Sequence, residues 1–400
     1  MTLKNIKKIR VVMVVPWHSE IMGYSDNFLP KFLSKLGFDV HLITGNAQVY
    51  FNHRDYKETL ESVLGPKKTD CGVKKVDGYT VHRLPLVSIG RSFYIKGLIK
   101  KIKDLSPNVV QSGEFKILTT YQIAIAKIRY GFKFYIENHT HLSVFNIKGL
   151  IRSIKFTLYS WTIGKVLNKV ADLVFPISSD AAFITNNFFG ISKDKIEIIS
   201  LGTDSSLFFP LELSSPDVIR KRNKFRSEIG FSENDIVCIY TGRIIKGKSP
   251  IILANAIQIL NEDPTLSVKG FFIGSGDSEY IKKINNIPGC LVHDFVPTQE
   301  LPVFYQMSDI AVWPKQESTS QLDAMSCGLP IILSDKVQII ERIEGNGCTY
   351  KESDSHDLAR VIKSIVSSDI RSKMRSISIS KVQRQFDWEI IAKKYSKHYL

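Results

Sequence analysis

Short apolar runs alternate with amphipathic stretches along the whole chain. Residues 10–17 (RVVMVVPW), 39–45 and 172–179 are apolar on consecutive positions, whereas residues 24–38 place Phe and Leu at helical spacing. Strands that are apolar on both faces and separated by helices indicate a parallel sheet covered on both sides. The pattern therefore predicts an α/β fold.

A second series of the same kind begins after a Ser-, Pro- and Gly-rich linker at residues 196–217. Its expected strands lie at 235–243, 266–276, 289–296, 309–315 and 329–335. We predict two Rossmann-like, doubly wound domains, residues 1–200 and 201–383. The carboxyl ends of their strands would face a central cleft, because ligands of such sheets bind at those ends.

Composition narrows the class of protein. A hydrophobic content of 44% with 23% charged residues is globular. The five cysteines are scattered, which favours a reducing compartment over a disulfide framework. The apolar run near the start is too short for a signal peptide, and no run approaches eighteen apolar residues. We expect a cytoplasmic protein.

Charge is distributed unevenly between the halves. Residues 1–200 contain 29 Lys and Arg against 15 Asp and Glu, whereas residues 201–400 contain 25 against 24. The net charge of +15 therefore lies almost wholly on the first half. This favours an anionic partner there, which could be membrane phospholipid, nucleic acid or a phosphorylated substrate.

Basic and glycine-rich loops follow two strands of the second half. Arg243 and Lys248, with Gly242 nearby, are two cations beside flexible backbone, which suits a diphosphate. A solvated basic loop is the alternative. Gly274 begins a G-x-G, but Glu279 stands where a dinucleotide fingerprint needs its third glycine, so this signal is weak.

Two loops of the first half carry further candidates. Gly23 lies in a strand-to-helix loop that suits either an anion at the helix start or a plain tight turn. His139 and His141 stand beside Glu137 without a third ligand at suitable spacing, so we expect no metal site. An ordinary hydrogen-bonded role is the default for each histidine.

The segment QESTSQLDAMSCGLPII, residues 316–332, begins a helix with many polar groups. Ser320 and Asp323 have the spacing of a capping box, which accounts for part of that polarity. It leaves Glu317, Ser318 and Thr319 unexplained. Carboxylates near a helix start can bind the hydroxyls of a ribose and of a sugar, while the backbone N–H groups favour phosphate.

Several ordered motifs resemble those of the family-4 retaining glycosyltransferases of the GT-B fold (glycosyltransferase group 1), over essentially the full chain. YTGRIIKGKS resembles the family's diphosphate loop, and GFFIGSGDSEYIKK its strand and G-x-G turn. VHDFVPTQELPVFYQMSDIAVWPK follows the family pattern near the nucleotide base, and LDAMSCGLPII is similar to L-E-A-M-A-C-G-x-P. The segments 16–44 and 382–399 resemble the family's first loop and helix and its closing helix.

The resemblance implies roles for particular residues. Arg243 and Lys248 would neutralise the leaving diphosphate, and Asp323 would bind the ribose. Glu317 would bind the sugar hydroxyls, and His139 would reach the sugar near the acceptor. The remaining nucleotide-sugar contacts are expected at Gly23, Gly242, Gly274, Val292, Ser318, Thr319 and Ser320. Residues 384–400 would form a helix that completes the first domain.

The chain departs from the family pattern at three points. Asp294 replaces a glycine, and Glu317 and Ser318 replace Phe-Gly. The E-x7-E signature places a glutamate eight residues before the ribose-binding acid, but Lys315 stands there, and the nearest acid is Glu317. Either Glu317 takes the sugar-hydroxyl role through a differently shaped loop, or that role is altered here. The resemblance implies a metal-independent, retaining hexosyltransferase without a cofactor, whose donor is a UDP- or GDP-sugar. Its acceptor would be a lipid-linked or cell-surface glycan, in polysaccharide or glycoconjugate biosynthesis.

Residues 93–105 and 147–167 interleave Lys and Arg with apolar side chains, which suits peripheral binding to an anionic membrane at the inner face of the plasma membrane. Helices that bury their apolar side in the core are the alternative. Two other functions fit parts of the sequence. A GT-B sugar-nucleotide epimerase would need an acid/base constellation that the sequence does not display. A basic nucleic-acid-binding protein would need an aromatic-basic motif or recognition helix.

Overall fold

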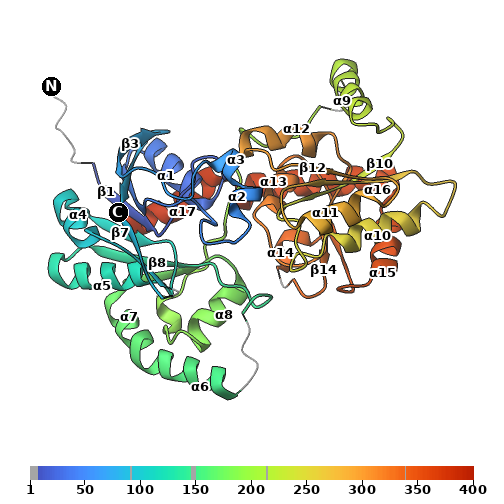
Figure 1. Ribbon diagram of the computed structural model, residues 1–400. Helices are drawn as coiled ribbons and strands as arrows, with labels where there is room; N and C mark the ends of the chain where they lie inside the picture. The colour runs from blue at the N-terminus through green and yellow to red at the C-terminus, as the bar shows by residue number, and fades with distance from the viewer. Residues whose placement is uncertain (1–7, 91, 146–149, 213–214, 338) are drawn as a thin grey trace. The chain divides into compact units, whose positions relative to one another are not determined.

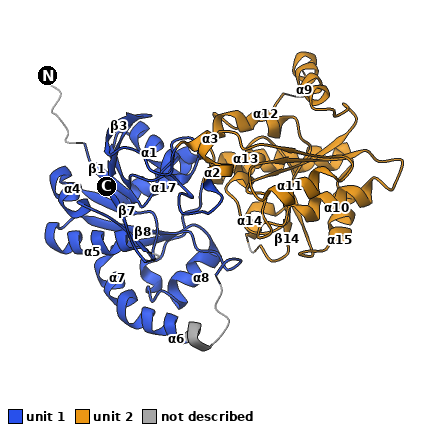
Figure 2. Ribbon diagram, in the orientation of Figure 1, with its two compact units in different colours: residues 1–56, 66–201, 388–400 blue, residues 57–65, 202–387 orange. Residues whose placement is uncertain are grey.

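The computed structural model describes residues 8–90, 92–145, 150–212, 215–337 and 339–400, with the side chains of residues 150–153 also outside the description. These residues form two units, drawn in separate colours in Figure 2. Unit 1 comprises residues 1–56, 66–201 and 388–400, and unit 2 comprises residues 57–65 and 202–387. Each unit contains a mainly parallel sheet with helices (Figure 1), which confirms the predicted α/β class.

The described residues of unit 1 form a seven-stranded sheet in the order β3-β4-β2-β1-β7-β8-β9. A separate antiparallel hairpin, β5 and β6, follows β4. The strands are β1 Arg10–Val15, β2 Asp39–Gly45, β3 Gly72–Val76, β4 Tyr79–Leu84, β5 Leu86–Ile89, β6 Ser92–Ile95, β7 Val109–Ser112, β8 Lys133–Asn138 and β9 Leu173–Pro176.

The edge strand β3 corrects the expectation of a wholly parallel sheet, because it pairs antiparallel with β4. Asp77 and Gly78 connect the two strands with φ of 44° and 88°. Positive φ at both positions of a two-residue connection is typical of a tight hairpin turn. Because β3 is a largely exposed edge strand, its polar sequence lacked the apolar pattern from which the other strands were predicted.

The helices of unit 1 cover this sheet, and the last one comes from the end of the chain. Trp388 of that helix, α17, stacks on Phe28 of α1 with 6.2 Å between ring centroids. The helices are α1 Ser25–Lys35, α4 Leu98–Leu105, α5 Leu118–Tyr130, α6 Leu150–Tyr159, α7 Lys165–Val170, α8 Ser179–Asn187 and α17 Trp388–Tyr399, with a π-helix, η1 Ser160–Gly164, between α6 and α7.

In unit 2 the described residues form a six-stranded parallel sheet in the order β12-β11-β10-β13-β14-β15. Its strands are β10 Ile236–Thr241, β11 Val268–Ile273, β12 Cys290–His293, β13 Ile310–Trp313, β14 Ile331–Ser334 and β15 Gly347–Tyr350. The helices are α9 Pro216–Glu228, α10 Ile251–Leu260, α11 Ser278–Asn285, α12 Leu301–Gln306, α13 Ser320–Ser326, α14 Ile340–Ile343, α15 Ser355–Ser364 and α16 Ser368–Lys381. The short helices α2 Tyr56–Thr59 and α3 Glu61–Leu64 precede β3 along the chain.

Both sheets reverse their strand order at a central strand. In unit 1, β1 lies between β2 and β7, and in unit 2, β10 lies between β11 and β13. Ligands of open α/β sheets bind outside the carboxyl ends of the strands at such a switch point. Ligands are therefore expected at the loops that follow β1 and β7 in unit 1 and at those that follow β10 and β13 in unit 2.

Among the described helices, none has the length and apolar character needed to cross a bilayer.

Candidate functional site

The loops after β10 and β11 of unit 2 are packed backbone against backbone. A Cβ on Gly274 would lie 2.0 Å from the carbonyl oxygen of Gly242, and a Cβ on Gly276 would lie 2.1 Å from that of Ile244. Gly242 and Gly274 also have φ of 141° and 145°. The approach of these loops explains why glycine is required there. A nucleotide contact by Gly242 or Gly274 stays a prediction.

Lys248 extends from the β10 loop to the segment that follows β13. Its Nζ donates to the backbone oxygen of Glu317 at 2.9 Å. Burial lowers the pKa of Lys248, and the nearby charge of Glu317 opposes that shift. The structure therefore brings together two predicted site residues that are 69 positions apart. Arg243 lies in the same loop, half-buried, where its backbone oxygen accepts a hydrogen bond from Tyr240.

Arg342 of α14 also binds the segment that follows β13, and the sequence analysis did not identify this residue. This buried guanidinium donates to the backbone oxygen of Ser318 at 3.2 Å and to Oε1 of Gln321 at 2.9 Å. Gln316, just before, has a φ of 66°, which non-glycine residues rarely adopt. The apolar neighbours of Arg342 in the sequence hinted at its burial, but nothing there indicated its backbone partner.

The predicted capping box at the start of α13 does not form. The helix begins at Ser320 after Thr319, whose backbone is already helical and makes no side-chain cap bond. Ser320 Oγ instead lies 2.6 Å from Ser318 Oγ. Asp323 accepts a hydrogen bond from Thr203 at 2.7 Å. The carboxylate of Asp323 therefore accepts from a residue 120 positions away in sequence and does not cap the start of α13.

Asp323 has an unusual environment for a carboxyl group. Burial raises its pKa to about 7, and the charge of Asp204 adds to the increase, while the hydrogen bond from Thr203 opposes it. A carboxyl group whose pKa lies near neutral in a strand-end site is a candidate functional group. Its assignment to a ribose stays a prediction.

Lys315, at the departing position of the family signature, lies 3.7 Å from Glu352, which follows β15. The hydroxyl of Tyr350 donates to the backbone oxygen of Pro314 and holds that part of the segment. Glu317, by contrast, is close enough to Lys248 to affect its pKa. The role of Glu317 at the sugar hydroxyls stays a prediction.

Val292 lies in the edge strand β12 and is half-buried. Its backbone N–H donates to Oδ1 of Asn285 at 2.9 Å, and its register partner on β11 is Phe272. The structure thus places it in the same sheet as the other predicted residues of unit 2, on the strand beyond β11. Its contact with a nucleotide stays a prediction.

His139 of unit 1 follows β8 and pairs with a buried carboxylate. Its Nε2 lies 2.9 Å from Oε2 of Glu137. The other carboxylate oxygen accepts from Gln111 at 2.6 Å and from Tyr395 of α17 at 2.9 Å. Burial lowers the pKa of His139, but the hydrogen bond and charge of Glu137, helped by Glu114 and Asp26, raise it overall.

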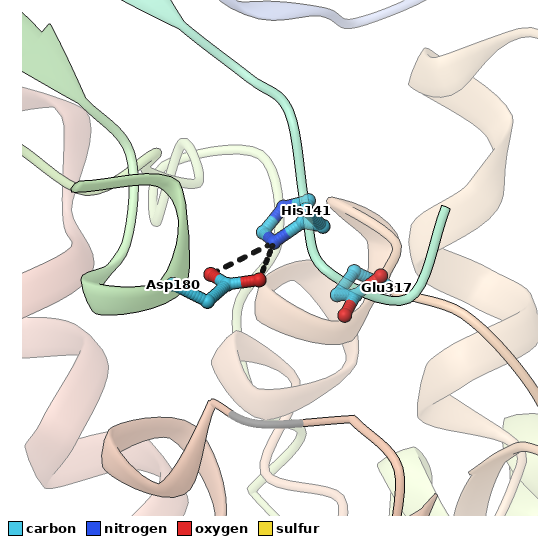
Figure 3. Close-up of side chains that lie close together, drawn as sticks. All are labelled: His141, Asp180 and Glu317. Atoms are coloured by element: carbon cyan, nitrogen blue, oxygen red, sulfur yellow. Dashed lines mark hydrogen bonds and ion pairs between the residues drawn. The ribbon is translucent and has the colours of Figure 1, made fainter. Parts of the chain in front are cut away.

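His141 has a separate carboxylate partner from α8. Figure 3 shows its Nδ1 facing both oxygens of Asp180, each at 3.2 Å. Asp180 also accepts from the backbone N–H of Leu142 and from Ser178. Burial works against ionisation of Asp180, but these hydrogen bonds lower its pKa to about 2. The hydrogen-bonded role expected for both histidines is therefore observed.

The Gly23 loop between β1 and α1 is held by Asn27. The Asn27 amide donates to the backbone oxygens of Ser19 and Glu20, and its Oδ1 accepts from the N–H of Tyr24. Gly23 has a φ of 65°. These bonds favour the tight-turn interpretation, because the N–H of Tyr24 is already used. A nucleotide contact at Gly23 stays a prediction.

Part of the chain matches a known protein family, and two curated proteins resemble it at low sequence identity. Residues 221–382 match the family model described as "Glycosyl transferases group 1". The chain is 28% identical over 247 residues to spore coat protein SA of Bacillus subtilis, a match that covers 56% of this chain and 64% of that protein. It is 23% identical to the uncharacterized glycosyltransferase MJ1069 of Methanocaldococcus jannaschii, with 98% of both chains covered.

Solved structures of glycosyltransferases match the fold over nearly the whole chain. Anabaena Alr3699/HepE, solved in complex with UDP-glucose, aligns with a TM-score of 0.69 and 17% identity, covering 98% of this chain and 99% of that one. Residues 221–382 thus resemble the group 1 glycosyl transferases, and the chain as a whole has the GT-B fold of solved glycosyltransferase structures.

Proposed function

We propose that this enzyme transfers a hexose, with retention of anomeric configuration, from a nucleotide-diphospho-sugar to a hydroxyl of a lipid-linked or cell-surface glycan. The observation that carries the proposal is the placement of Lys248 against the segment of Glu317 at the switch point of unit 2. A cation beside backbone N–H groups and a carboxylate suits a diphosphate joined to a sugar.

In this proposal Lys248 and Arg243 neutralise the charge that develops on the diphosphate as the glycosidic bond breaks. Fixed charges aimed at a developing anion in a partly buried site are commonly the largest catalytic contribution. The same two cations make a metal ion unnecessary for that role. Asp323 binds the ribose, and the N–H groups of residues 318–320 face the phosphates or the sugar.

Glu317 binds the sugar hydroxyls, and His139, protonated more readily because its pKa is raised, donates to the sugar from unit 1. Attack occurs on the face from which the diphosphate departs, and a phosphate oxygen takes the hydroxyl proton. No protein nucleophile is required. The binding of UDP-glucose by the HepE structure supports a UDP-hexose as the donor.

In this proposal the enzyme binds its acceptor at an anionic membrane surface. On the segment α6–η1–α7 of unit 1, the exposed fractions of Ile154, Leu158 and Trp161 are 58%, 63% and 69%. Lys155 and Lys165 are exposed on the same segment, and Nζ of Lys165 lies 5.2 Å from the centre of the Trp161 ring. Exposed aromatic and aliphatic side chains among lysines suit the interface of anionic lipid.

The other stretch suggested for the membrane is arranged differently. Residues 93–105 divide into β6 and α4, and α4 buries Leu98 and Ile102 in the core of unit 1. The core-packing alternative therefore holds for the apolar side of α4, which leaves its lysines as the exposed part. Residues 147–149 of the second stretch lie outside the described residues.

A panel of UDP-, GDP- and dTDP-hexoses tests the donor, with the melting temperature as the measurement. A ligand that binds only the folded protein raises that temperature. We expect one sugar nucleotide to stabilise the wild type and to lose this effect in Lys248→Ala. NMR of the product formed in EDTA should show the anomeric configuration of the donor. An inverted product, or activity that needs added metal, would contradict the retaining, metal-independent mechanism.

A further inference from the structure

His18 occupies the loop between β1 and α1, at the switch point of unit 1, and the proposed mechanism does not use it. The side chain is fully buried, at 0% exposure. Its Nδ1 lies 2.5 Å from Oδ2 of Asp26, which is in the first turn of α1. The pair is therefore an imidazole backed by a carboxylate, a combination that fixes the orientation and tautomer of the ring.

The second ring nitrogen of His18 lacks a partner. A carboxylate only accepts hydrogen bonds, so in the neutral ring Nδ1 carries the hydrogen and Nε2 carries a lone pair. Nε2 is buried, and the described residues offer it no hydrogen-bond partner. Leaving a buried acceptor unsatisfied costs about 1–3 kcal/mol, so such a group calls for an explanation.

Both the backbone N–H and the backbone oxygen of His18 are hydrogen-bonded to other segments of unit 1. The N–H of His18 donates to the backbone oxygen of Ala47 at 3.3 Å, and the His18 oxygen accepts from Arg83 at 3.1 Å. Ser19 donates to Oε1 of Gln48 at 2.5 Å. The unpartnered nitrogen of His18 therefore belongs to a loop that several hydrogen bonds hold in place.

His18 shares its surroundings with the candidate site of unit 1. The charge of its partner, Asp26, contributes to raising the pKa of His139, and so does the charge of Glu114. Asp26, Glu114 and His139 follow β1, β7 and β8, which are consecutive in the sheet. His18 and His139 therefore follow two strands, β1 and β8, whose carboxyl ends lie at the same side of the sheet.

We propose that Nε2 of His18 accepts a hydrogen bond from a hydroxyl of a pyranoside acceptor and orients that hydroxyl for attack. This inference rests on the proposed function, because it needs a hydroxyl acceptor. The hydroxyl oxygen forms the bond to the anomeric carbon of the donor. The bond from that carbon to the diphosphate breaks, its electron pair stays on the diphosphate, and the hydroxyl proton passes to a diphosphate oxygen. The acceptor displaces the protein atoms that cover Nε2.

The tautomer of His18 can be measured on the full chain without a ligand. In protein labelled with ¹⁵N-histidine, we expect a protonated Nδ1 and a bare Nε2 near pH 7.5, with the resonances assigned by their loss in His18→Gln. Asp26→Asn removes the charge that holds the hydrogen on Nδ1, so the Nε2–H form should become populated. A wild-type ring that carries its hydrogen on Nε2 would overturn the proposal.

Kinetics with methyl hexopyranosides as probe acceptors supply the second test. UDP release from UDP-glucose is measured above the background of attack by water. Loss of one hydrogen bond to a hydroxyl should raise the KM for the probe about tenfold in His18→Phe. His18→Gln keeps a hydrogen-bond acceptor near the position of Nε2 and should recover most of the loss. Calorimetry with UDP should be unchanged in both variants.

His82→Phe is the matched control. His82 is also buried and has an unpartnered nitrogen, Nδ1, but it lies within β4 and contacts His41. An equal rise of KM in His82→Phe and His18→Phe would assign the effect to packing and overturn the proposal. A wild type that binds UDP but transfers to none of the probes would refute the pyranoside class. A wild type that binds none of the UDP-, GDP- and dTDP-hexoses would refute the proposed function instead.

Discussion

In unit 2, Lys248 and Arg342 donate to the backbone oxygens of Glu317 and Ser318. In unit 1, by contrast, His18, His139 and His141 face carboxylates. The first arrangement keeps positive charge beside a backbone segment and suits a phosphorylated group. The second holds neutral or protonated rings in a defined orientation and suits hydroxyl groups. Similar parallel sheets thus present different chemistry at their carboxyl ends.

The comparison also shows which bonds are local. The Lys248 and Arg243 motif lies within one loop, so its spacing is visible in the sequence. The carboxylate of Glu137 is held by its near neighbour His139 and also by Gln111 and Tyr395, which are 26 and 258 positions away. The candidate residues of unit 2 were accordingly easier to predict from sequence than the contacts of unit 1.

The largest expected effect is on the cations of unit 2. Lys248→Ala and Arg243→Ala should each lower kcat about 100-fold or more, because each removes a charge that stabilises the leaving group. The neighbouring Lys246 is exposed, and Lys246→Ala should leave kcat unchanged. Wild-type rates in both site variants, measured by UDP release, would show that the diphosphate lies elsewhere.

The next effect concerns Asp323 and pH. Its pKa of about 7 means that the folded protein holds a proton that the unfolded chain releases near its ordinary value of 3.8. The folded state therefore binds more protons between about pH 4 and pH 7, and stability should fall as pH rises through that window. Asp323→Asn should remove this part of the slope in denaturant titrations.

Nucleotide binding by Asp323 should change in the opposite direction. Ribose hydroxyls donate more strongly to a carboxylate than to a neutral carboxyl group, so affinity for free UDP should increase as pH rises through 7. Asp323→Ala should weaken UDP binding roughly tenfold at pH 8, since such bonds contribute about 1.5–3 kcal/mol. Calorimetry that finds no pH dependence in the wild type would remove the ribose assignment.

Glu317 should separate the sugar from the nucleotide. Glu317→Gln should lower affinity for the sugar nucleotide several-fold, to about tenfold, because bonds to a charged acceptor are stronger than those to an amide. Affinity for free UDP should stay the same, since the backbone contact from Lys248 is retained. Equal losses with both ligands would assign Glu317 to the folding of its segment alone.

The smallest effect distinguishes two surfaces of unit 1. Lys165→Gln on α7 should weaken binding to phosphatidylglycerol vesicles about fivefold, since each lysine near anionic lipid contributes roughly 1 kcal/mol. Lys103→Gln on α4 is the matched control and should have less effect, because α4 turns its apolar side into the core. Binding should decrease in high salt. Equal effects of the two variants would contradict a role for the α6–η1–α7 segment.

The amino-acid sequence established the α/β class and predicted buried strands such as β1, β2, β10 and β14, because fully buried strands leave continuous apolar runs. It did not predict the edge strands β3 and β15. It also indicated the segments that contain Lys248, Glu317 and Asp323, since each lies in a loop or helix with a recognisable local pattern. The hydrogen-bond partners of these three side chains became known only from the tertiary structure. Thr203 takes the carboxylate that local spacing assigned to a helix cap, and Arg342 binds a carbonyl from 24 residues away. Hydrogen bonds between distant segments depend on how strands are ordered in the sheet, and hydrophobic periodicity carries no record of that order.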